Sequence, residues 1–331
     1  MAQIPEKIVA SKADSSKPRI FRFLMPAFVV AMVALAGFLL YRTISRYSLE
    51  ELVASVQSFP SGKLALAFMF AAASYVCLTG FDTLALRYVG KPLPYPRTAL
   101  ASFVSLSLGH NIGMAALSSG AIRYRFYSRW GLSLAEVAQL IVFCGVTVAL
   151  GLTLLGGLAI LVQPDLAAKT TGFDSAWMVA LGILCLAICS LYLVLAAFWK
   201  KPFAFKKWTF RFPSLPLAIG QLIIGPLNFA CVAACLHQAL SAAADVNYLQ
   251  TATVYVIANI TSLISHVPGG LGVIESVVLL LVPEGQLIGA LIVFRFVYFL
   301  APLLLGGILF AISEFALRNT HPQKHAAAQP A

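Results

Sequence analysis

An apolar stretch with a break in its middle, residues 251–282, constrains this chain more than any other feature. It reads TATVYVIANITSLISH, then VPGGLG, then VIESVVLLLV, and the break contains Pro268, Gly269, Gly270 and Gly272. Proline removes a backbone donor and clashes with the preceding helical turn, and glycine weakens a helix, so a straight helix is disfavoured here. The arm after the break is about 15 Å of helix, half of a hydrocarbon core of about 30 Å. The stretch therefore predicts a re-entrant helical hairpin with its tip near mid-membrane, where broken backbone survives only inside protein or beside a polar cavity.

The composition places the whole chain in a membrane. Its 331 residues are 60% hydrophobic and 11% charged, with a mean hydropathy of +0.89, whereas a soluble domain is nearer half apolar and a quarter charged. The net charge of +11 would suit a nucleic acid, but basic residues beside membrane spans follow the positive-inside rule, so we expect no nucleic-acid partner. The six cysteines lie in apolar segments without His or acid at ligand spacing. We expect them to be packing residues, with no metal and no cofactor.

Six apolar segments are long enough to cross a bilayer. They are residues 23–41, 64–86, 133–162, 177–199, 217–240 and 286–312. A signal peptide has a shorter apolar core and a small-residue cleavage site, so the first segment predicts an uncleaved span. Residues 48–57 open with a capping-box pattern and predict a short surface helix.

The segment 98–122 leaves two topologies open. As one helix it would place Arg123 and Arg125 outside, whereas a hairpin broken at Gly109 and Gly113 would return them to the inside. With both hairpins re-entrant, the inside segments hold 18 Lys or Arg and the outside segments hold four. This asymmetry favours an all-α polytopic protein with six full crossings, two re-entrant hairpins and both termini cytoplasmic.

One offset of 156 residues relates the two halves of the chain. His110 and His266 each begin an H-x-x-G pattern, and the same shift carries three spans of the first half onto spans of the second. Each half contains span, span, hairpin and span, and the second half begins on the opposite side. This order predicts an inverted-topology repeat with a substrate site at the repeat interface. The predicted boundaries are a cytoplasmic tail at 1–22, repeat A at 23–163, repeat B at 164–312 with its hairpin at 251–282, and a cytoplasmic tail at 313–331.

Two motifs, HVPGGLGVIE at 266–275 and SGAIRYRFYSRWGLS at 119–133, resemble the membrane part of the lysylphosphatidylglycerol synthase/flippase family. This family is also called multiple peptide resistance factor. The resemblance covers most of 60–312 and includes TGFDTLALRYVGKPLPYPR at 79–97. The last span adds the pattern Arg295, Tyr298, Pro302. The resemblance implies a multi-pass protein of the bacterial inner membrane that moves aminoacylated phospholipid from the inner to the outer leaflet.

Full-length members of that family also carry a soluble domain that transfers lysine from tRNA to the lipid. This chain ends at Ala331 without such a domain, so we expect no enzyme activity and no special support for lysylphosphatidylglycerol as cargo. The first hypothesis is a translocase for an anionic or aminoacylated phospholipid. The alternatives are a lipid-modifying membrane enzyme, for which no HExxH, GxSxG or P-loop motif is present, and a non-transporting partner of a lipid-synthesis enzyme encoded separately. A homo-oligomer is a further alternative for the assembly.

Charged residues beside the two tips are the first candidates for the site. Glu275 and Arg295 are costly at membrane depth unless they are paired or hydrated, which predicts either a headgroup gate or a structural ion pair. Arg123 and Arg125 follow the first hairpin. They could hold a lipid phosphate through charge-assisted contacts or anchor the chain at the interface.

Polar residues at the tips complete the candidate set. His110 and His266 are either packing residues or titrating groups near neutral pH, and Asp82, Asn228 and Asn259 either line the cavity or bond between helices. The second arm of each hairpin starts near mid-membrane, where free N–H groups and partial positive charge suit an anionic phosphodiester. The predicted lipid-binding and translocation residues, none catalytic or metal-binding, are His110, Asn111, Gly113, Arg123, Arg125, His266, Pro268, Gly269, Gly270, Gly272, Glu275 and Arg295.

Overall fold

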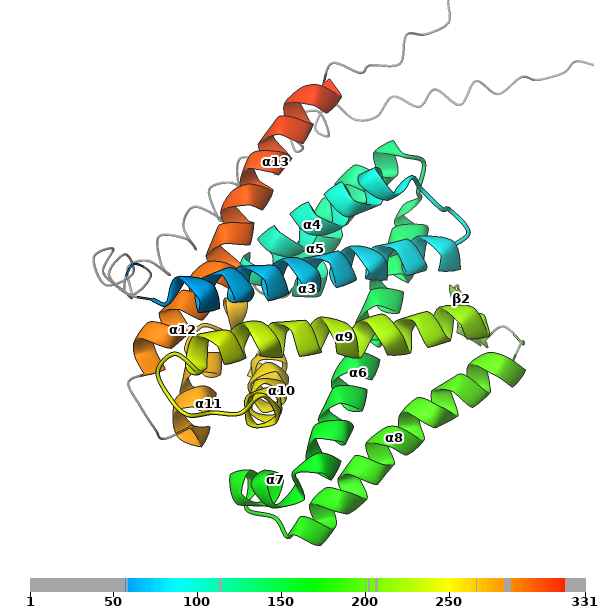
Figure 1. Cartoon of the computed structure of the whole chain (residues 1–331). Coiled ribbons are helices and arrows are strands. Elements are labelled where there is room, and N and C mark those ends of the chain that lie inside the picture. The colour runs from blue at the N-terminus through cyan, green and yellow to red at the C-terminus, as the bar shows by residue number, and fades with distance from the viewer. Residues whose placement is uncertain are drawn as a thin grey trace, which may run out of the picture.

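The structure is a computed structural model of the whole chain, drawn in Figure 1. It describes residues 57, 59–112, 115–199, 201, 203–205, 208–265, 267–282 and 287–318. The predicted first span at 23–41 and nearly all of the predicted surface helix at 48–57 lie outside the described residues, as do Gly113 and His266.

Five helical segments in the described part are long and apolar enough to cross a membrane. They are α3 (Ser61–Tyr88), α6 (Leu134–Val162), α8 (Ser175–Phe198), α9 (Leu215–Leu240) and a continuous rod made of α12 (Leu287–Arg295), η2 (Phe296–Leu300) and α13 (Ala301–Arg318). Each begins within three residues of the start predicted from the sequence. The prediction of a polytopic helical membrane protein is confirmed for these five spans.

Both stretches predicted as hairpins are interrupted and form pairs of packed helices. The first pair is α4 (Tyr95–Ile112) and α5 (Ala115–Arg129); the second is α10 (Tyr248–Ser265) and α11 (Val273–Leu281), with the short turn η1 (Pro268–Gly270) between them. In the first pair, a Cβ added to Gly109 would lie 2.7 Å from the Cβ of Ser119. The glycine therefore lets the two arms approach closely, as small residues do between membrane helices.

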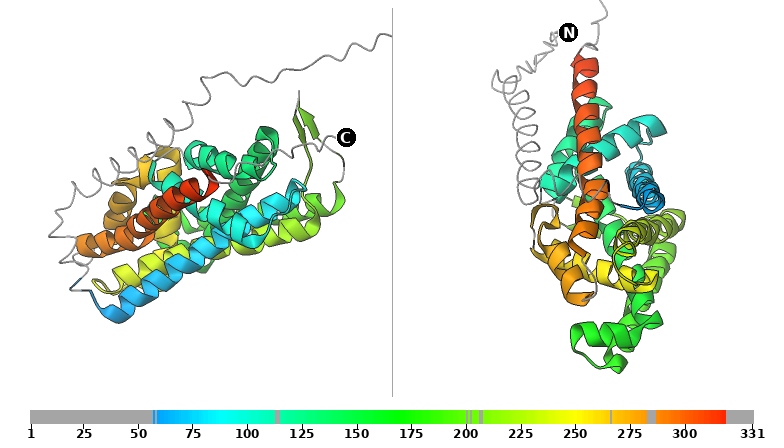
Figure 2. Two further views of the ribbon diagram at one scale, coloured as in Figure 1. Left: turned by 90° about the horizontal axis from the view of Figure 1, so that it is seen from above. Right: turned by 60° about the vertical axis from the view of Figure 1, so that its left-hand side comes forward.

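The helices α3 and α9 form the centre of the molecule. They lie side by side and run in opposite directions in Figures 1 and 2, and Figure 1 draws the two hairpins on opposite sides of this pair. Glycine also permits a close crossing of α6 and α9, because a Cβ on Gly151 of α6 would lie 2.6 Å from the carbonyl carbon of Gly225 of α9. Backbone contact of this kind drives helix association in lipid, where the hydrophobic effect between helices is absent.

The offset of 156 residues also relates the observed helices. Shifted by it, α3 would run from 217 to 244, close to α9, and α4 would run from 251 to 268, close to α10. The last residue of α6 lands on 318, where α13 ends. The helix bounds thus follow the predicted repeat, while its boundaries in the membrane remain a prediction.

Three short elements were not predicted from the sequence. Helix α7 (Pro164–Thr171) joins α6 to α8, and strands β1 (Phe203–Phe205) and β2 (Trp208–Phe210) pair in antiparallel fashion before α9. This small sheet is an addition to the predicted all-α architecture.

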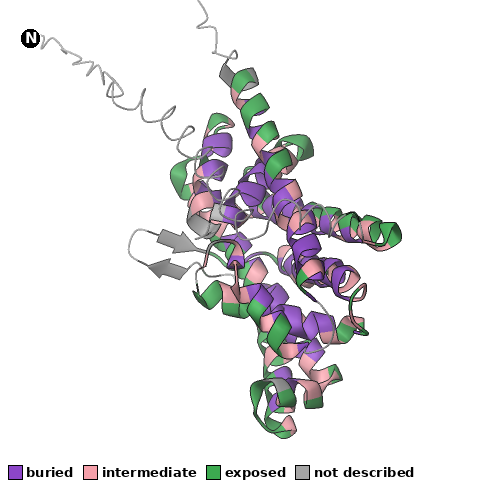
Figure 3. Ribbon diagram, turned by 90° about the vertical axis from the view of Figure 1, so that its left-hand side faces the viewer, coloured by how far each residue is buried: buried purple, intermediate pink, exposed green. Residues whose placement is uncertain are grey.

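Figure 3 shows buried residues gathered toward the interior and exposed residues on the outer faces of the helices, many of which are large and apolar. Helix α8 is the most exposed of the long helices, since only 17% of its apolar window is buried, compared with 67% for the rod of α12, η2 and α13. Its exposed side chains are nevertheless large and apolar, and include Leu181, Ile183, Leu184, Ile188, Leu191 and Val194. An apolar surface of this extent suits lipid rather than water.

Candidate functional site: a cavity between two hairpin tips

A cavity of about 550 Å³ lies where the two hairpins meet the long helices. The hairpins contribute His110, Ser119, Arg123, Asn259, Ser262, Gly269 and Gly270, and the long helices contribute Leu78, Phe81, Cys144, Asn228, Phe229, Tyr298 and Phe299. Polar groups from both hairpins therefore converge on one space whose remaining walls are apolar and aromatic. Such a combination is typical of a ligand site.

The tips of the two hairpins touch at this cavity. A Cβ added to Gly269 would lie 3.6 Å from the carbonyl oxygen of His110 and 3.9 Å from the Cα of Asn111. The Asn111 amide nitrogen donates to the carbonyl oxygens of Ser107 at 2.8 Å and of Phe299 at 3.4 Å, so it fixes the end of α4. His110 and Gly269, one position from each of the two H-x-x-G patterns, are thus neighbours in space.

Two glycines shape the second tip through backbone angles that other residues rarely adopt. Gly269 has φ +60° and Gly270 has φ +58°. A Cβ on Gly270 would also lie 2.3 Å from the hydroxyl of Ser262, whereas the nearest atoms to a Cβ on Gly269 are at ordinary contact distance. Gly270 is therefore required both by its backbone angles and by the close approach of α10.

Arg295 and Glu275 form the predicted ion pair, and they also hold the second tip. The Nε of Arg295 lies 2.5 Å from Oε1 of Glu275, and its Nη2 donates to Oε2 at 2.9 Å. The guanidinium also donates to the backbone carbonyls of Gly269 and, at 2.7 Å, of Gly270. Oε2 of Glu275 accepts the backbone N–H of Gly272 at 2.9 Å. One buried pair therefore closes a ring of contacts around the Pro-Gly-Gly turn.

This ring changes what the start of α11 can bind. The carboxylate of Glu275 occupies the N-terminal end of the helix, where its charge compensates the partial positive charge of the helix start. The sequence predicted that free N–H groups at this helix start would bind a phosphodiester. For the N–H of Gly272 this prediction is wrong, because the carboxylate of Glu275 accepts its hydrogen bond.

Arg123 pairs with an acid that the sequence did not assign to it. Its Nε and Nη2 donate to the two carboxylate oxygens of Asp82 at 3.0 and 2.8 Å, and its Nη1 donates to the hydroxyl of Ser119 at 3.1 Å. The phenol of Tyr127 donates to the same carboxylate at 2.7 Å. Asp82 is fully buried and Arg123 is 3% exposed. Of the two roles left open for Asp82, it takes the bond between helices, while Arg123 itself lines the cavity.

Arg125 lies away from the cavity lining. Its guanidinium pairs with Glu314 of α13 at 2.5 Å, and Arg129 reaches the same carboxylate at 3.1 Å. The two arginines that the sequence grouped together thus have different places, one at the cavity and one between α5 and α13.

Two asparagines on different helices, Asn228 of α9 and Asn259 of α10, line the cavity. Asn228 accepts a hydrogen bond from the hydroxyl of Ser74 at 2.7 Å, and that hydroxyl also lies 3.1 Å from the phenol of Tyr298. Asn259 donates to the phenol of Tyr255 at 3.0 Å. Both asparagines line the cavity, which is the first of the two predicted alternatives, and Asn228 also forms a bond between helices, which is the second.

The wall beside the tips contains a turn of π-helix, η2. Pro302 has no N–H to donate to the carbonyl of Tyr298 four residues earlier, and that carbonyl accepts the phenol of Tyr75 at 3.5 Å. The backbone widens between Phe296 and Ala301, whose N–H donates to the Phe296 carbonyl. Single π-turns within α-helices are frequent at functional sites.

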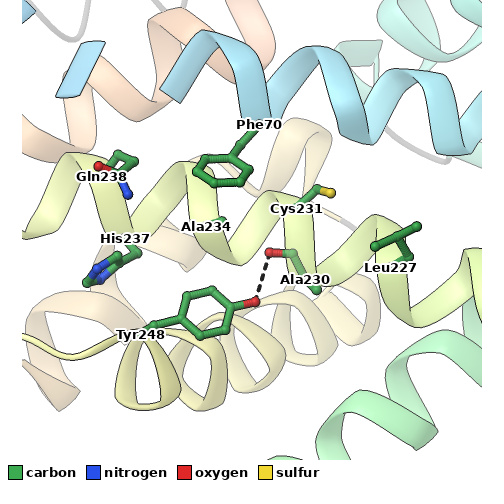
Figure 4. A pocket seen from close by; sticks show the side chains of 8 residues that line it. All are labelled: Phe70, Leu227, Ala230, Cys231, Ala234, His237, Gln238 and Tyr248. Carbon is green, nitrogen blue, oxygen red and sulfur yellow. Dashed lines mark hydrogen bonds between the residues drawn. The ribbon is translucent and has the colours of Figure 1, made fainter. Parts of the chain in front are cut away.

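A second pocket of about 410 Å³ lies between α3, α9 and α10 and shares no lining residue with the central cavity. Figure 4 shows its lining: Phe70, Leu227, Ala230, Cys231, Ala234, His237, Gln238 and Tyr248. Tyr248 turns its phenol to the carbonyl of Ala230 at 3.0 Å. The pocket is largely apolar and contains no residue of either hairpin tip.

The family model of the lysylphosphatidylglycerol synthase TM region matches residues 29–306, which is most of the chain and includes every residue that lines the central cavity. The chain belongs to this family. The match covers both hairpins and every element that lines the cavity.

Relatives of two kinds share this region. The protein slr0712 of Synechocystis is 34% identical over 277 residues, which cover 82% of this chain and 85% of the relative. The inner membrane protein YbhN of Escherichia coli is 28% identical over 285 residues, which cover 84% and 88%. The phosphatidylglycerol lysyltransferase of Staphylococcus aureus is 21% identical over 298 residues, which cover 88% of this chain but 34% of that protein. The chain is thus similar to a membrane protein along its length and to one part of a larger lipid-related protein.

The structure sorts the residues predicted for the site into three groups. His110, Arg123, Gly269 and Gly270 line the cavity; Asn111, Pro268, Gly272, Glu275 and Arg295 belong to the two tips or to the ring that holds them; and Arg125 lies apart. Sequence reasoning missed Ser262 and Tyr255 as lining residues and Glu314 as a partner. The helical spacing of Tyr255, Asn259 and Ser262 on one face of α10 could have indicated the first two.

Proposed function

We propose that this protein is a phospholipid translocase whose lipid headgroup passes between the two hairpin tips through the central cavity. In this proposal both hairpins are re-entrant, the chain crosses the membrane six times, and both termini are cytoplasmic. The protein performs no chemistry on its cargo. A partner enzyme for lipid synthesis and a homo-oligomer remain compatible with this proposal, and neither is needed for it.

The observation that carries the proposal is the polar convergence inside an apolar protein. Buried charge and broken backbone are expensive in a membrane and mark substrate paths. Here both breaks, at the end of α4 and at Gly269, meet beside one cavity with Arg123 in its wall. A purely structural membrane protein would have no need to collect these costly features in one place.

The geometry of Arg123 suits a phosphate. Within the described residues, Asp82 and Ser119 take three of the five N–H donors of its guanidinium, which leaves two for a ligand. Arginine binds phosphate through paired, charge-assisted hydrogen bonds. Asn228 and Asn259 add neutral donors and acceptors that suit the hydroxyl groups of a headgroup, and the apolar walls suit the glycerol backbone and the first carbons of the acyl chains.

The comparisons support the class of lipid. Part of the phosphatidylglycerol lysyltransferases is similar to this chain, and their name states that they act on phosphatidylglycerol. We infer that the cargo is an anionic phospholipid of this type, with or without an aminoacyl group. Transfer of lysine is a property of those proteins and is not proposed for this chain.

The test is leaflet-resolved transport by the purified protein in liposomes. Ser262→Phe would fill the cavity from α10, and Ser190→Phe makes the same change on the exposed face of α8. Movement of fluorescent phosphatidylglycerol between leaflets should be slowed about tenfold or more by Ser262→Phe, equivalent to a barrier higher by about 1.4 kcal/mol, and unchanged by Ser190→Phe. Equal rates in protein-containing and protein-free liposomes would refute the proposal.

A further inference from the structure

We infer that Asp82 binds a proton when Arg123 binds the lipid phosphate, so that the anionic lipid and a proton move together. This inference rests on the proposed function, because the anion is the phosphate of the transported lipid. The proton would provide a source of energy for transport. Neither the description of the family nor the names of the relatives state such a source.

The first observation is that Arg123 contacts both the central cavity and the buried carboxylate of Asp82. Its guanidinium lines the central cavity and is also paired through two hydrogen bonds with Asp82, which is fully buried behind it. Asp82 does not line the cavity, so a ligand reaches Arg123 but not the carboxylate. The pair is neutral as a unit, so an anion that binds the remaining donors of the arginine adds a second negative charge beside Asp82.

The second observation is that the two buried ion pairs are built differently. Arg295 is held by the carbonyls of Gly269 and Gly270 as well as by Glu275, so moving it would release the second tip. Among the described residues, the hydrogen-bond partners of the Arg123 guanidinium are side chains, those of Asp82 and Ser119. Arg123 can therefore turn toward a ligand without disturbing backbone, whereas Arg295 serves as a fixed support.

The surroundings of Asp82 contain groups that can accompany protonation. From α5, Arg123 and Tyr127 face the carboxylate, and from α6 the thiol of Cys144 lies 3.5 Å from Oδ1. From α4, His110 lines the same cavity as Arg123. Helix α9, which packs against α3, has no titratable residue from Leu215 to Phe229. Among the described residues, Arg123 is the cation that balances this acid.

Charge balance then requires the proton. When a phosphodiester with one negative charge takes Arg123, the site holds two anions and one cation at low dielectric, which is strongly unfavourable. Formation of an O–H bond on Asp82, with a proton delivered by water from the side on which the lipid enters, restores neutrality. The protonated carboxyl can still accept from Tyr127. Release of the lipid on the other side returns Arg123 to Asp82, and the proton leaves to water on that side.

Binding calorimetry separates this inference from the proposed function. The full chain in phosphatidylcholine nanodiscs is titrated with dihexanoyl phosphatidylglycerol in two buffers of different ionisation enthalpy, so that the difference in heat gives the protons taken up. The wild type should take up about one proton per lipid bound, and Asp82→Asn should bind the lipid with no uptake. Asp165→Asn, the same change at an exposed acid near the start of α7, should match the wild type.

Binding by the wild type without proton uptake would overturn the coupling and leave the proposed function intact, whereas absence of binding would overturn both. Equal uptake by the wild type and Asp82→Asn would also overturn the assignment of the proton to Asp82. A second measurement needs no variant, in case Asp82→Asn fails to fold. In liposomes with an imposed pH gradient, fluorescent phosphatidylglycerol should accumulate in the leaflet that faces the alkaline side. An unchanged distribution between the leaflets during active transport would exclude the coupling.

Discussion

At the scale of single residues, Arg295 and Glu275 form an ion pair that also makes hydrogen bonds to the backbone of the second tip. Breaking a buried pair leaves one charge without compensation and typically costs about 3–5 kcal/mol. Arg295→Gln and Glu275→Gln should therefore each lower the unfolding temperature strongly and abolish transport. The double variant should recover only part of the stability, because the carbonyls of Gly269 and Gly270 still lose their charged donor.

The coupling free energy between the two residues is measured by thermal unfolding in detergent. The wild type, both single variants and the double variant are compared. Losses that simply add would show that the residues do not act as partners. Full recovery of both stability and transport in the double variant would instead show a pair that is structural only, without the support of the turn that the structure assigns to Arg295.

The residue scale also shows what the sequence could predict about the site. Glu275 and Arg295 were predictable as a pair because ionisable groups at membrane depth need a partner. The pairing of Arg123 with Asp82 was not, since the two residues lie on different helices and Arg123 also fitted an interfacial position. Only the packing of α5 against α4 and α6 decides that Arg123 turns inward to Asp82.

At the scale of elements, the crossing of α6 and α9 depends on two glycines. A Cβ on Gly151 would lie 2.6 Å from the backbone of Gly225, and no rotamer change can relieve a collision with backbone. Gly151→Ala should therefore destabilise the protein by about 1–3 kcal/mol, the usual cost of overpacking. Gly307→Ala is the matched control, because a Cβ there meets nothing within 4 Å.

Thermal unfolding of these two variants in the same detergent is the measurement. An unfolding temperature for Gly151→Ala equal to that of Gly307→Ala would show that α6 and α9 do not cross as closely as the structure has them.

The spans themselves were predictable because hydropathy and length suffice to define them. The π-turn η2 was not, although Pro302 marks its neighbourhood, because a missing donor at one residue does not say how the backbone rearranges. The pairing of β1 with β2 was also missed. Each strand has only three residues, and the prediction for this segment used only its basic charge.

At the scale of the whole molecule, the strongest support for an inverted repeat is the opposite direction of α3 and α9. The sequence offset relates these two helices, and an inverted repeat requires equivalent helices to run in opposite directions. The cavity could not be predicted in the same way. Its walls come from elements far apart in the sequence, and its volume depends on how their side chains pack.

The proposed topology is tested by pairs of single cysteines in a cysteine-free background. If the first hairpin is re-entrant, Lys91→Cys before it and Ala135→Cys after it lie on the same side, inside. If the second is re-entrant, Asp245→Cys and Glu284→Cys both lie outside, because the positive-inside rule places the basic segments in the cytoplasm. A membrane-impermeant maleimide applied to intact cells should then label the second pair and spare the first until the cells are opened. Labelling of one member of a pair without the other would mean that the corresponding hairpin crosses the membrane, and the two tips would then no longer enter from opposite sides to meet at Gly269.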